Sequence, residues 1–161
     1  MAESGLLDFG HTPVTARIAL ILMAVYLLLG GCGLPRVIVL SDPLTPEEHL
    51  TLGVTYEKNN ELDAALREYR SAAEHLPVGY LYMGNVYFAE GELDNAEKYY
   101  RKAIDADTGN SDARNNLAWL YYTRNTNLEE AELLVRNAIR LNPAKADIYR
   151  DTLDKILSRK R

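Results

Sequence analysis

The residue with the clearest chemical potential is Cys32, the only cysteine in this chain of 161 residues. Without a second cysteine, its thiol cannot form a disulfide within the chain. It follows an uninterrupted apolar run, residues 18–29, and the small pair Gly30-Gly31. Because a cysteine thiolate is a strong nucleophile, this placement predicts covalent modification of Cys32.

The apolar run has the layout of a secretory signal peptide, with Arg17 before it and small residues after it. It is shorter than the roughly 20 apolar residues that a spanning helix needs. Leu29-Gly30-Gly31-Cys32 resembles the lipobox of bacterial lipoproteins. The resemblance implies a signal peptide over 1–31 and a diacylglyceryl group on Cys32, the new N-terminus, which anchors the protein in the membrane. The alternative is an uncleaved signal anchor with a buried thiol.

The residues before the apolar run differ from an ordinary signal peptide, and the residue after Cys32 bears on the membrane in which the protein is anchored. The stretch before Arg17 is long and contains Glu3 and Asp8, whereas a translation start at Val14 would give an ordinary signal. In proteobacterial lipoproteins an Asp after the cysteine commonly retains the protein in the inner membrane, so Gly33 favours the outer membrane, facing the periplasm. Residues 32–44 then form a lipidated N-terminus and linker, in which 37–40 are either a short extended segment or part of an unstructured tether.

Composition and motifs exclude other functions. Eighteen basic against 23 acidic residues give a net charge of -5, and no segment is basic enough to follow a phosphate backbone, which disfavours nucleic-acid binding. His11, His49 and His75 have no partners at metal-ligand spacing. The chain contains no phosphate-binding glycine loop, nucleophile elbow or paired-carboxylate motif. We therefore predict a protein that is not an enzyme and has no cofactor or metal.

Beyond residue 44 the chain repeats itself. Thr45-Pro46-Glu47-Glu48 combines a capping residue, a proline and a capping-box glutamate, which predicts the start of a helix. Three copies of a first motif follow: Leu52-Gly53-x-x-Tyr56, Met83-Gly84-x-x-Tyr87 and Leu117-Ala118-x-x-Tyr121. After each copy come a turn and a second motif with paired alanines: Ala65 and Ala72, Ala96 and Ala103, Ala131 and Ala138.

This pattern resembles the tetratricopeptide repeat over residues 46–143, including its usual period between Gly84 and Ala118. The resemblance implies an all-α solenoid of about three helical hairpins over 45–143, closed by a capping helix over 144–161. We expect Gly53, Gly84 and Ala118 at close helix crossings, facing Ala65, Ala96 and Ala131. We expect Tyr56, Tyr69, Tyr87 and Tyr100 to fill the gaps between hairpins, and Asn60 and Gly91 to take a positive φ in the turns.

Three features of the array are less regular. Gly53 and Gly84 are closer in sequence than Gly84 and Ala118, which predicts a late start of the next helix or a tight connection. The third repeat has one extra residue in the turn 124–127, which predicts a protruding loop. The last helix is expected to bury one face, formed by Ile148, Tyr149, Thr152, Leu153 and Ile156, as a cap on the final hairpin.

In stacked hairpins of this kind the first helix of each pair lines the concave surface, which predicts a binding groove for an extended peptide or partner helix. Asparagine pairs with a peptide backbone and aromatic rings offer contact area at low entropic cost. The predicted groove residues are Leu50, Val54, Tyr82, Asn85, Phe88, Asn115, Asn116, Trp119 and Tyr122. The opposing interpretation is that the aromatic residues pack on the linker or the cap, which applies most to Phe88 and Tyr122. Only Asn116 suits the carboxylate clamp of some family members, so that clamp is not expected.

Together these features predict a lipoprotein that acts as a scaffold for assembly of an envelope complex of the pilus, secretion or exopolysaccharide type. Its partners are other proteins, bound in the groove, and the membrane, reached through the lipid on Cys32. The alternative is an accessory subunit that recruits or feeds peptide substrate to an envelope enzyme such as a peptidase or cell-wall hydrolase. The sequence leaves the partner and the oligomeric state open.

Overall fold

The computed structural model describes residues 18, 22, 23, 25 and 42–161. The four described residues of the apolar run are helical, and their side chains are exposed. Residues Pro43–Arg161 form one compact unit. Cys32 lies outside the described residues, as do the rest of the predicted signal peptide and residues 32–41 of the linker. Among the helices of the described residues, none combines the length and the apolar character needed to cross a membrane.

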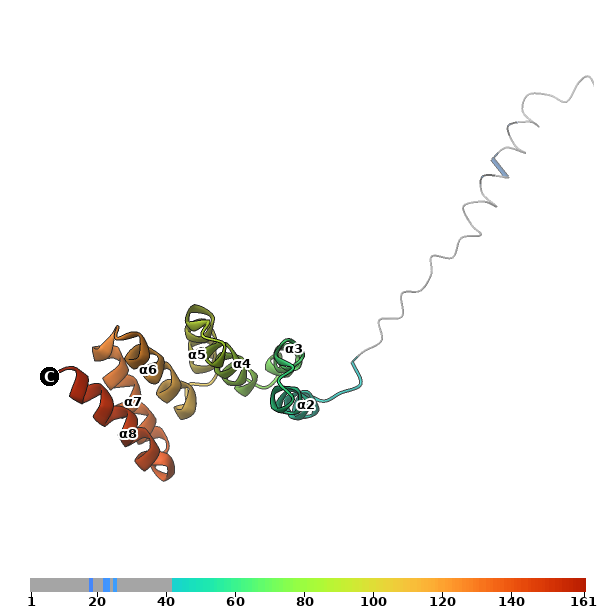
Figure 1. Ribbon diagram of the computed structural model, residues 1–161. Coiled ribbons are helices and arrows are strands. Elements are labelled where there is room, and N and C mark those ends of the chain that lie inside the picture. The colour runs from blue at the N-terminus through green and yellow to red at the C-terminus, as the bar shows by residue number, and fades with distance from the viewer. Residues whose placement is uncertain (1–17, 19–21, 24, 26–41) are drawn as a thin grey trace, which may run out of the picture. The chain divides into compact units, whose positions relative to one another are not determined.

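The compact unit contains seven α-helices and one short 3-10 helix (Figure 1). They are α2 (Pro46–Lys58), α3 (Leu62–Ala73), α4 (Val78–Ala89), α5 (Leu93–Ala106), α6 (Ser111–Arg124), α7 (Leu128–Leu141), η1 (Pro143–Lys145) and α8 (Ala146–Arg159). Helices α2 and α3 form hairpin 1, α4 and α5 form hairpin 2, and α6 and α7 form hairpin 3, while α8 packs on both helices of hairpin 3. This confirms the predicted all-α array of three hairpins and a final helix.

The helix ends follow from local chemistry. The Thr45 side chain accepts a bond from the backbone N–H of Glu48 (3.2 Å), and the Glu48 carboxylate accepts one from the backbone N–H of Thr45 (2.7 Å), so the capping box is present as predicted. Asn60 and Gly91 have φ of 62° and 79°, which confirms their place in the turns. In the longer third turn, Asn125 and Asn127 both adopt the left-handed region, with φ of 55° and 49°.

The helix crossings require correction in one respect. A Cβ on Gly53 would lie 2.5 Å from the ring of Tyr69, and a Cβ on Gly84 would lie 2.5 Å from the ring of Tyr100. Each glycine therefore accommodates the tyrosine of its own hairpin, so these two rings do not serve only the gaps between hairpins. A large ring fills the space that each missing side chain leaves, a contact that the sequence analysis did not assign to these glycines.

The shorter spacing between Gly53 and Gly84 comes from shorter helices. Helices α3 and α4 have 12 residues each, whereas α5 and α6 have 14 each. At the start of α4, a Cβ on Gly79 would lie 2.6 Å from the carbonyl oxygen of Tyr69 and 2.8 Å from the backbone nitrogen of Ala73. Only glycine lets α4 begin so close to the backbone of α3.

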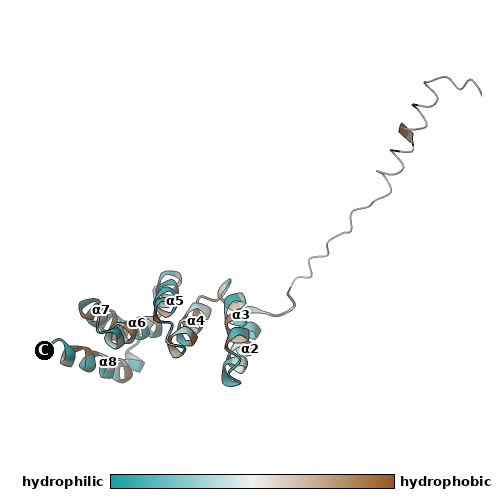
Figure 2. Ribbon diagram, turned by 45° about the horizontal axis from the view of Figure 1, so that its top comes forward, coloured by the Kyte–Doolittle hydropathy of each residue, from teal (hydrophilic) through white to brown (hydrophobic). Residues whose placement is uncertain are grey.

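The buried side chains fall into two clusters that together run along the compact unit. One joins hairpin 1 to α4 around Ala65, Leu66, Tyr69, Met83 and Val86. The larger one joins hairpins 2 and 3 to α8. Figure 2 shows polar and apolar residues alternating along α5, α7 and α8, each of which turns one side to this interior.

Helix α8 covers the end of hairpin 3 as predicted, with one exception. Tyr149, Thr152, Leu153 and Ile156 are buried, whereas Ile148 is 65% exposed. Consecutive helical residues are rotated by about 100°, so Ile148 turns away from the arc that Tyr149 and its partners occupy. Its assignment to the buried face was wrong.

Candidate functional site

All nine predicted groove residues lie on the first helices of the three hairpins, and all nine are half-buried. Helix α4 contacts α6, and α6 contacts α8, although these three helices are not consecutive in the chain. The side chains on them therefore share one surface, which we call the α4–α6–α8 surface: Asn85, Phe88, Asn115, Asn116, Trp119, Tyr122, Lys155 and Arg159. Leu50, Val54 and Tyr82 instead pack against the cluster of hairpin 1.

A chain of amide groups crosses from α6 to α4. The Asn116 Nδ2 donates to the Oδ1 of Asn85 (2.9 Å), and the same oxygen accepts from the hydroxyl of Tyr100 (3.0 Å). Burial raises the pKa of the Tyr100 hydroxyl, so it stays protonated and remains a donor. Because the Oδ1 of Asn85 takes both bonds, its Nδ2 is left to face a ligand.

Asn115 continues this chain at its edge. Its Nδ2 approaches the Oδ1 of Asn116 at 3.5 Å, a long and weak hydrogen bond. Its own Oδ1 is buried and has no hydrogen-bond partner among the described residues. A buried acceptor without a donor is costly, and because this oxygen has almost no exposed surface, a bound peptide does not reach it.

The aromatic residues of the surface have different surroundings. Phe88 and Tyr122 pack against the cluster of hairpins 2 and 3, as the opposing interpretation of the sequence expected. Trp119 is not among the side chains that the described residues place on that cluster. Its ring lies against Tyr122, with centroids 5.1 Å apart and planes inclined by 31°. Of these three aromatic residues, Trp119 is thus the one that lies outside the core cluster.

Helix α8 adds two cations that the sequence analysis did not assign to the surface. The Nζ of Lys155 lies 5.6 Å from the centroid of Trp119, and the guanidinium carbon of Arg159 lies 4.0 Å from the centroid of Tyr122. Arg159 also donates to the backbone oxygen (2.9 Å) and the hydroxyl (3.1 Å) of Tyr122. The sequence shows that Lys155 and Arg159 are four residues apart and therefore lie on one face of α8. It does not show that this face meets α6, because that depends on how α8 packs.

At the contact between hairpins 1 and 2 the predicted residues serve the interior more than a ligand. The ring of Tyr82 lies 5.0 Å from that of Tyr69, with an interplanar angle of 31°. The Tyr69 hydroxyl donates to Glu57 at 2.5 Å, and burial, strengthened by this carboxylate, raises the pKa of Tyr69. Leu50, Val54 and Tyr82 therefore stabilise the contact between hairpins 1 and 2.

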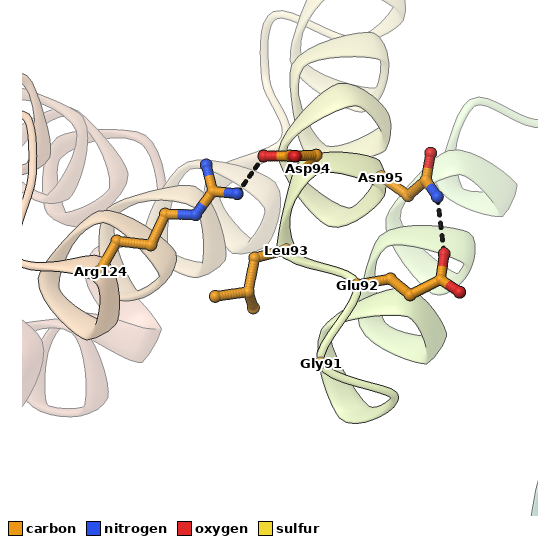
Figure 3. A pocket seen from close by; sticks show the side chains of 6 residues that line it. All are labelled: Gly91, Glu92, Leu93, Asp94, Asn95 and Arg124. Carbon is orange, nitrogen blue, oxygen red and sulfur yellow. Dashed lines mark hydrogen bonds and ion pairs between the residues drawn. The ribbon is translucent and has the colours of Figure 1, made fainter.

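A separate hollow of about 400 Å³ lies at the turn of hairpin 2. Figure 3 shows Arg124 of α6 reaching toward Asp94, while Asn95 turns back to Glu92. The charged side chains that line this hollow already have partners within it, and none of the predicted groove residues lines it. We therefore assign it a structural role.

Known proteins resemble this chain in its repeats. Two family models, both described as tetratricopeptide repeat, match residues 50–111 and 87–150. Protein bimA of Emericella nidulans is 32% identical to this chain over 108 residues, which cover 65% of the chain. The match spans only 13% of the length of bimA.

A solved structure shares the fold. It is the first tetratricopeptide repeat domain of Spaghetti (RPAP3), bound to the HSP90 peptide SRMEEVD. It superposes with a TM-score of 0.61 at 21% sequence identity, covering 71% of this chain and 94% of that one. At this level of identity the likeness concerns the arrangement of the helices.

Proposed function

The chain belongs to the tetratricopeptide repeat family, and we propose that it is a lipid-anchored scaffold of a bacterial cell envelope. The repeats are a protein-interaction module, and an extended segment of a partner protein is held on the α4–α6–α8 surface. The observation that carries this proposal is the combination of a half-buried Trp119 outside the core with three amides beside it.

The chemistry of the surface suits a peptide backbone. The Nδ2 of Asn85 can donate to a peptide carbonyl, because only the Oδ1 of this side chain is engaged within the protein. Trp119 supplies contact area for a side chain of the bound segment. Few charged groups are involved, so this part of the surface selects an extended chain more than a particular charge.

The membrane anchor rests on the sequence. Cys32 is the sole cysteine and follows Leu29-Gly30-Gly31 at the end of an apolar run. Acylation of this thiol would hold the repeats at a membrane, where a small scaffold gains effective concentration toward other envelope proteins. Gly33 favours the outer membrane, and an assembly role in a pilus, secretion or exopolysaccharide system fits a protein of this kind.

Two variants test the two halves of the proposal. Cys32→Ser should abolish lipidation and move the protein out of the membrane fraction or leave an uncleaved precursor. A Cys32→Ser protein that matures and fractionates like the parent would refute the anchor.

Trp119→Ala should reduce capture of partners in pull-downs from native membranes while its melting temperature stays close to the parent's. We choose it over Asn116→Ala because Asn116 also ties α6 to α4. Undiminished capture would refute the binding surface. Capture of an envelope peptidase or cell-wall hydrolase would identify the protein as an accessory subunit of that enzyme.

A further inference from the structure

The end of the α4–α6–α8 surface that α8 forms carries two cationic side chains, those of Lys155 and Arg159. Helix α8 follows the last repeat, and the sequence predicts that it is a cap covering the final hairpin. Its buried side fulfils that role. A second side, carrying Lys155 and Arg159, lies over the aromatic residues of α6. The helix therefore contributes to the surface as well as to the core.

Contacts with Tyr122 hold the guanidinium of Arg159 in place. Its guanidinium carbon is 4.0 Å from the centroid of the Tyr122 ring, and two of its amino groups donate to the backbone oxygen and hydroxyl of that residue. A guanidinium has five N–H groups, so three remain available for a further acceptor. The orientation is set before any ligand arrives, which lowers the entropic cost of using it.

No carboxylate neutralises this guanidinium within the part of the chain that the structure describes. Arg101, which likewise lies against an aromatic ring, does have acidic partners, Glu97 and Glu130. Lys155, one turn earlier on α8, pairs with Asp151. Positive charge at Arg159 is thus uncompensated beside the aromatic pair of Tyr122 and Trp119.

We propose that Arg159 binds an acidic side chain of the partner segment, next to the residue that lies on Trp119. This inference rests on the proposed function, because it names the chemistry of the segment bound at that same surface. The planar fork of arginine matches the two oxygens of a carboxylate. The segment is therefore apolar or aromatic at one position and acidic close by, toward α8.

Trp119 is the only tryptophan in the chain, so its fluorescence reports on this surface alone. The full-length chain in detergent micelles is used to select binders from a random twelve-residue peptide library displayed on phage. Selected peptides should contain Asp or Glu at a consistent distance from an apolar residue, and their synthetic forms should shift the emission of Trp119.

The role of Arg159 is tested by matched variants. Replacing the selected acidic residue by its amide should weaken binding to the parent about fivefold, as expected for one charge-assisted pair at an exposed site. The same replacement should have no effect on binding to Arg159→Gln. Arg150→Gln, on the same helix but paired with Asp147, should behave like the parent. Arg159→Lys should keep a preference for acidic peptides even if Arg159→Gln loses stability.

The outcomes separate the two proposals. Peptides that shift Trp119 emission without any acidic preference, or whose acidic residue is indifferent to Arg159, would overturn this inference and leave the proposed function intact. A library that yields no binders and no emission change would overturn both. Arg159-dependent binding to phosphatidylglycerol vesicles without peptide selection would assign the cation to a membrane surface and refute the inference.

Discussion

The two junctions between hairpins are built from different chemistry, although they occupy the same place in the repeat. At junction 1–2, between hairpins 1 and 2, tyrosine rings do most of the packing: Tyr69 lies against Tyr82, and Tyr80, Tyr87 and Tyr99 surround the same cluster. Within the described residues no side-chain hydrogen bond or ion pair connects these two hairpins. Their contact depends on apolar and aromatic burial, which salt barely affects.

Junction 2–3, between hairpins 2 and 3, contains a polar network. Glu97 of α5 accepts from the hydroxyl of Tyr121 (2.7 Å) and from Arg124 (3.1 Å). Arg101 donates to the same hydroxyl and to Glu130 (3.1 Å). A single repeat pattern thus accepts either rings or charges at its interfaces, and the choice decides whether a junction responds to salt and pH.

The largest effect is expected from removing a ring at junction 1–2. Tyr69 is fully buried, fills the space beside Gly53 and touches the next hairpin through Tyr82. Tyr69→Ala should lower the free energy of unfolding by about 3–5 kcal/mol, because it leaves a cavity at both contacts. Urea denaturation followed by circular dichroism measures this, and the loss should be equal at low and high salt. A loss that shrinks in high salt would contradict an apolar junction.

The next effect concerns two glycines, one at the start of α4 and one just before α6. Gly79→Ala places a methyl group 2.6 Å from backbone, which cannot move aside, whereas Gly109→Ala meets only the side chain of Asp107 at 3.1 Å. Gly79→Ala should cost about 1–3 kcal/mol by overpacking. Thermal melting should show Gly109→Ala close to the parent. Equal melting temperatures for the two variants would show that the tight start of α4 is not required.

A smaller effect should follow from removing charge at junction 2–3. Glu97→Gln deprives Arg101 and Arg124 of their shared carboxylate and should cost about 1–2 kcal/mol at low ionic strength. These ion pairs are partly exposed, so salt screens them. The cost of the substitution should therefore be smaller in 1 M salt, where the Debye length is about 3 Å. Denaturant midpoints at the two salt concentrations provide the measurement. A salt-independent cost would mean that packing, not charge, holds this junction.

The smallest effect at neutral pH, and the most specific, concerns the hydroxyl of Tyr121. Burial, together with the bond to Glu97, raises the pKa of Tyr121 from 10.0 to about 12. Above pH 10 the unfolded chain releases this proton while the folded chain keeps it, so stability is complete below pH 10.0 and declines as the pH rises toward about 12. Tyr121→Phe should make that decline shallower. The unfolding free energy of both proteins is measured at several pH values between these limits. An equal decline in stability for the parent and for Tyr121→Phe would contradict the assignment.

Much of the fold could be predicted because its determinants are local or periodic. The capping box at Thr45, the turn residues Asn60 and Gly91 and the small crossing residues Gly53 and Gly84 act through a few neighbours or a constant period. The nine groove residues were likewise placed correctly on the first helices, since repeat position alone decides which helix carries them. Their use by a partner remains a prediction.

The sequence by itself determined the number of hairpins, where their helices begin and turn, and which positions had to be small. Only the tertiary structure decided which polar groups meet: Glu97 with Tyr121 across 24 residues, and Arg159 with Tyr122 across 37. It also decided that Ile148 is exposed. The physical reason is rotation of each helix about its own axis, because a difference of one residue, about 100°, exchanges a buried neighbour for solvent without changing the repeat pattern.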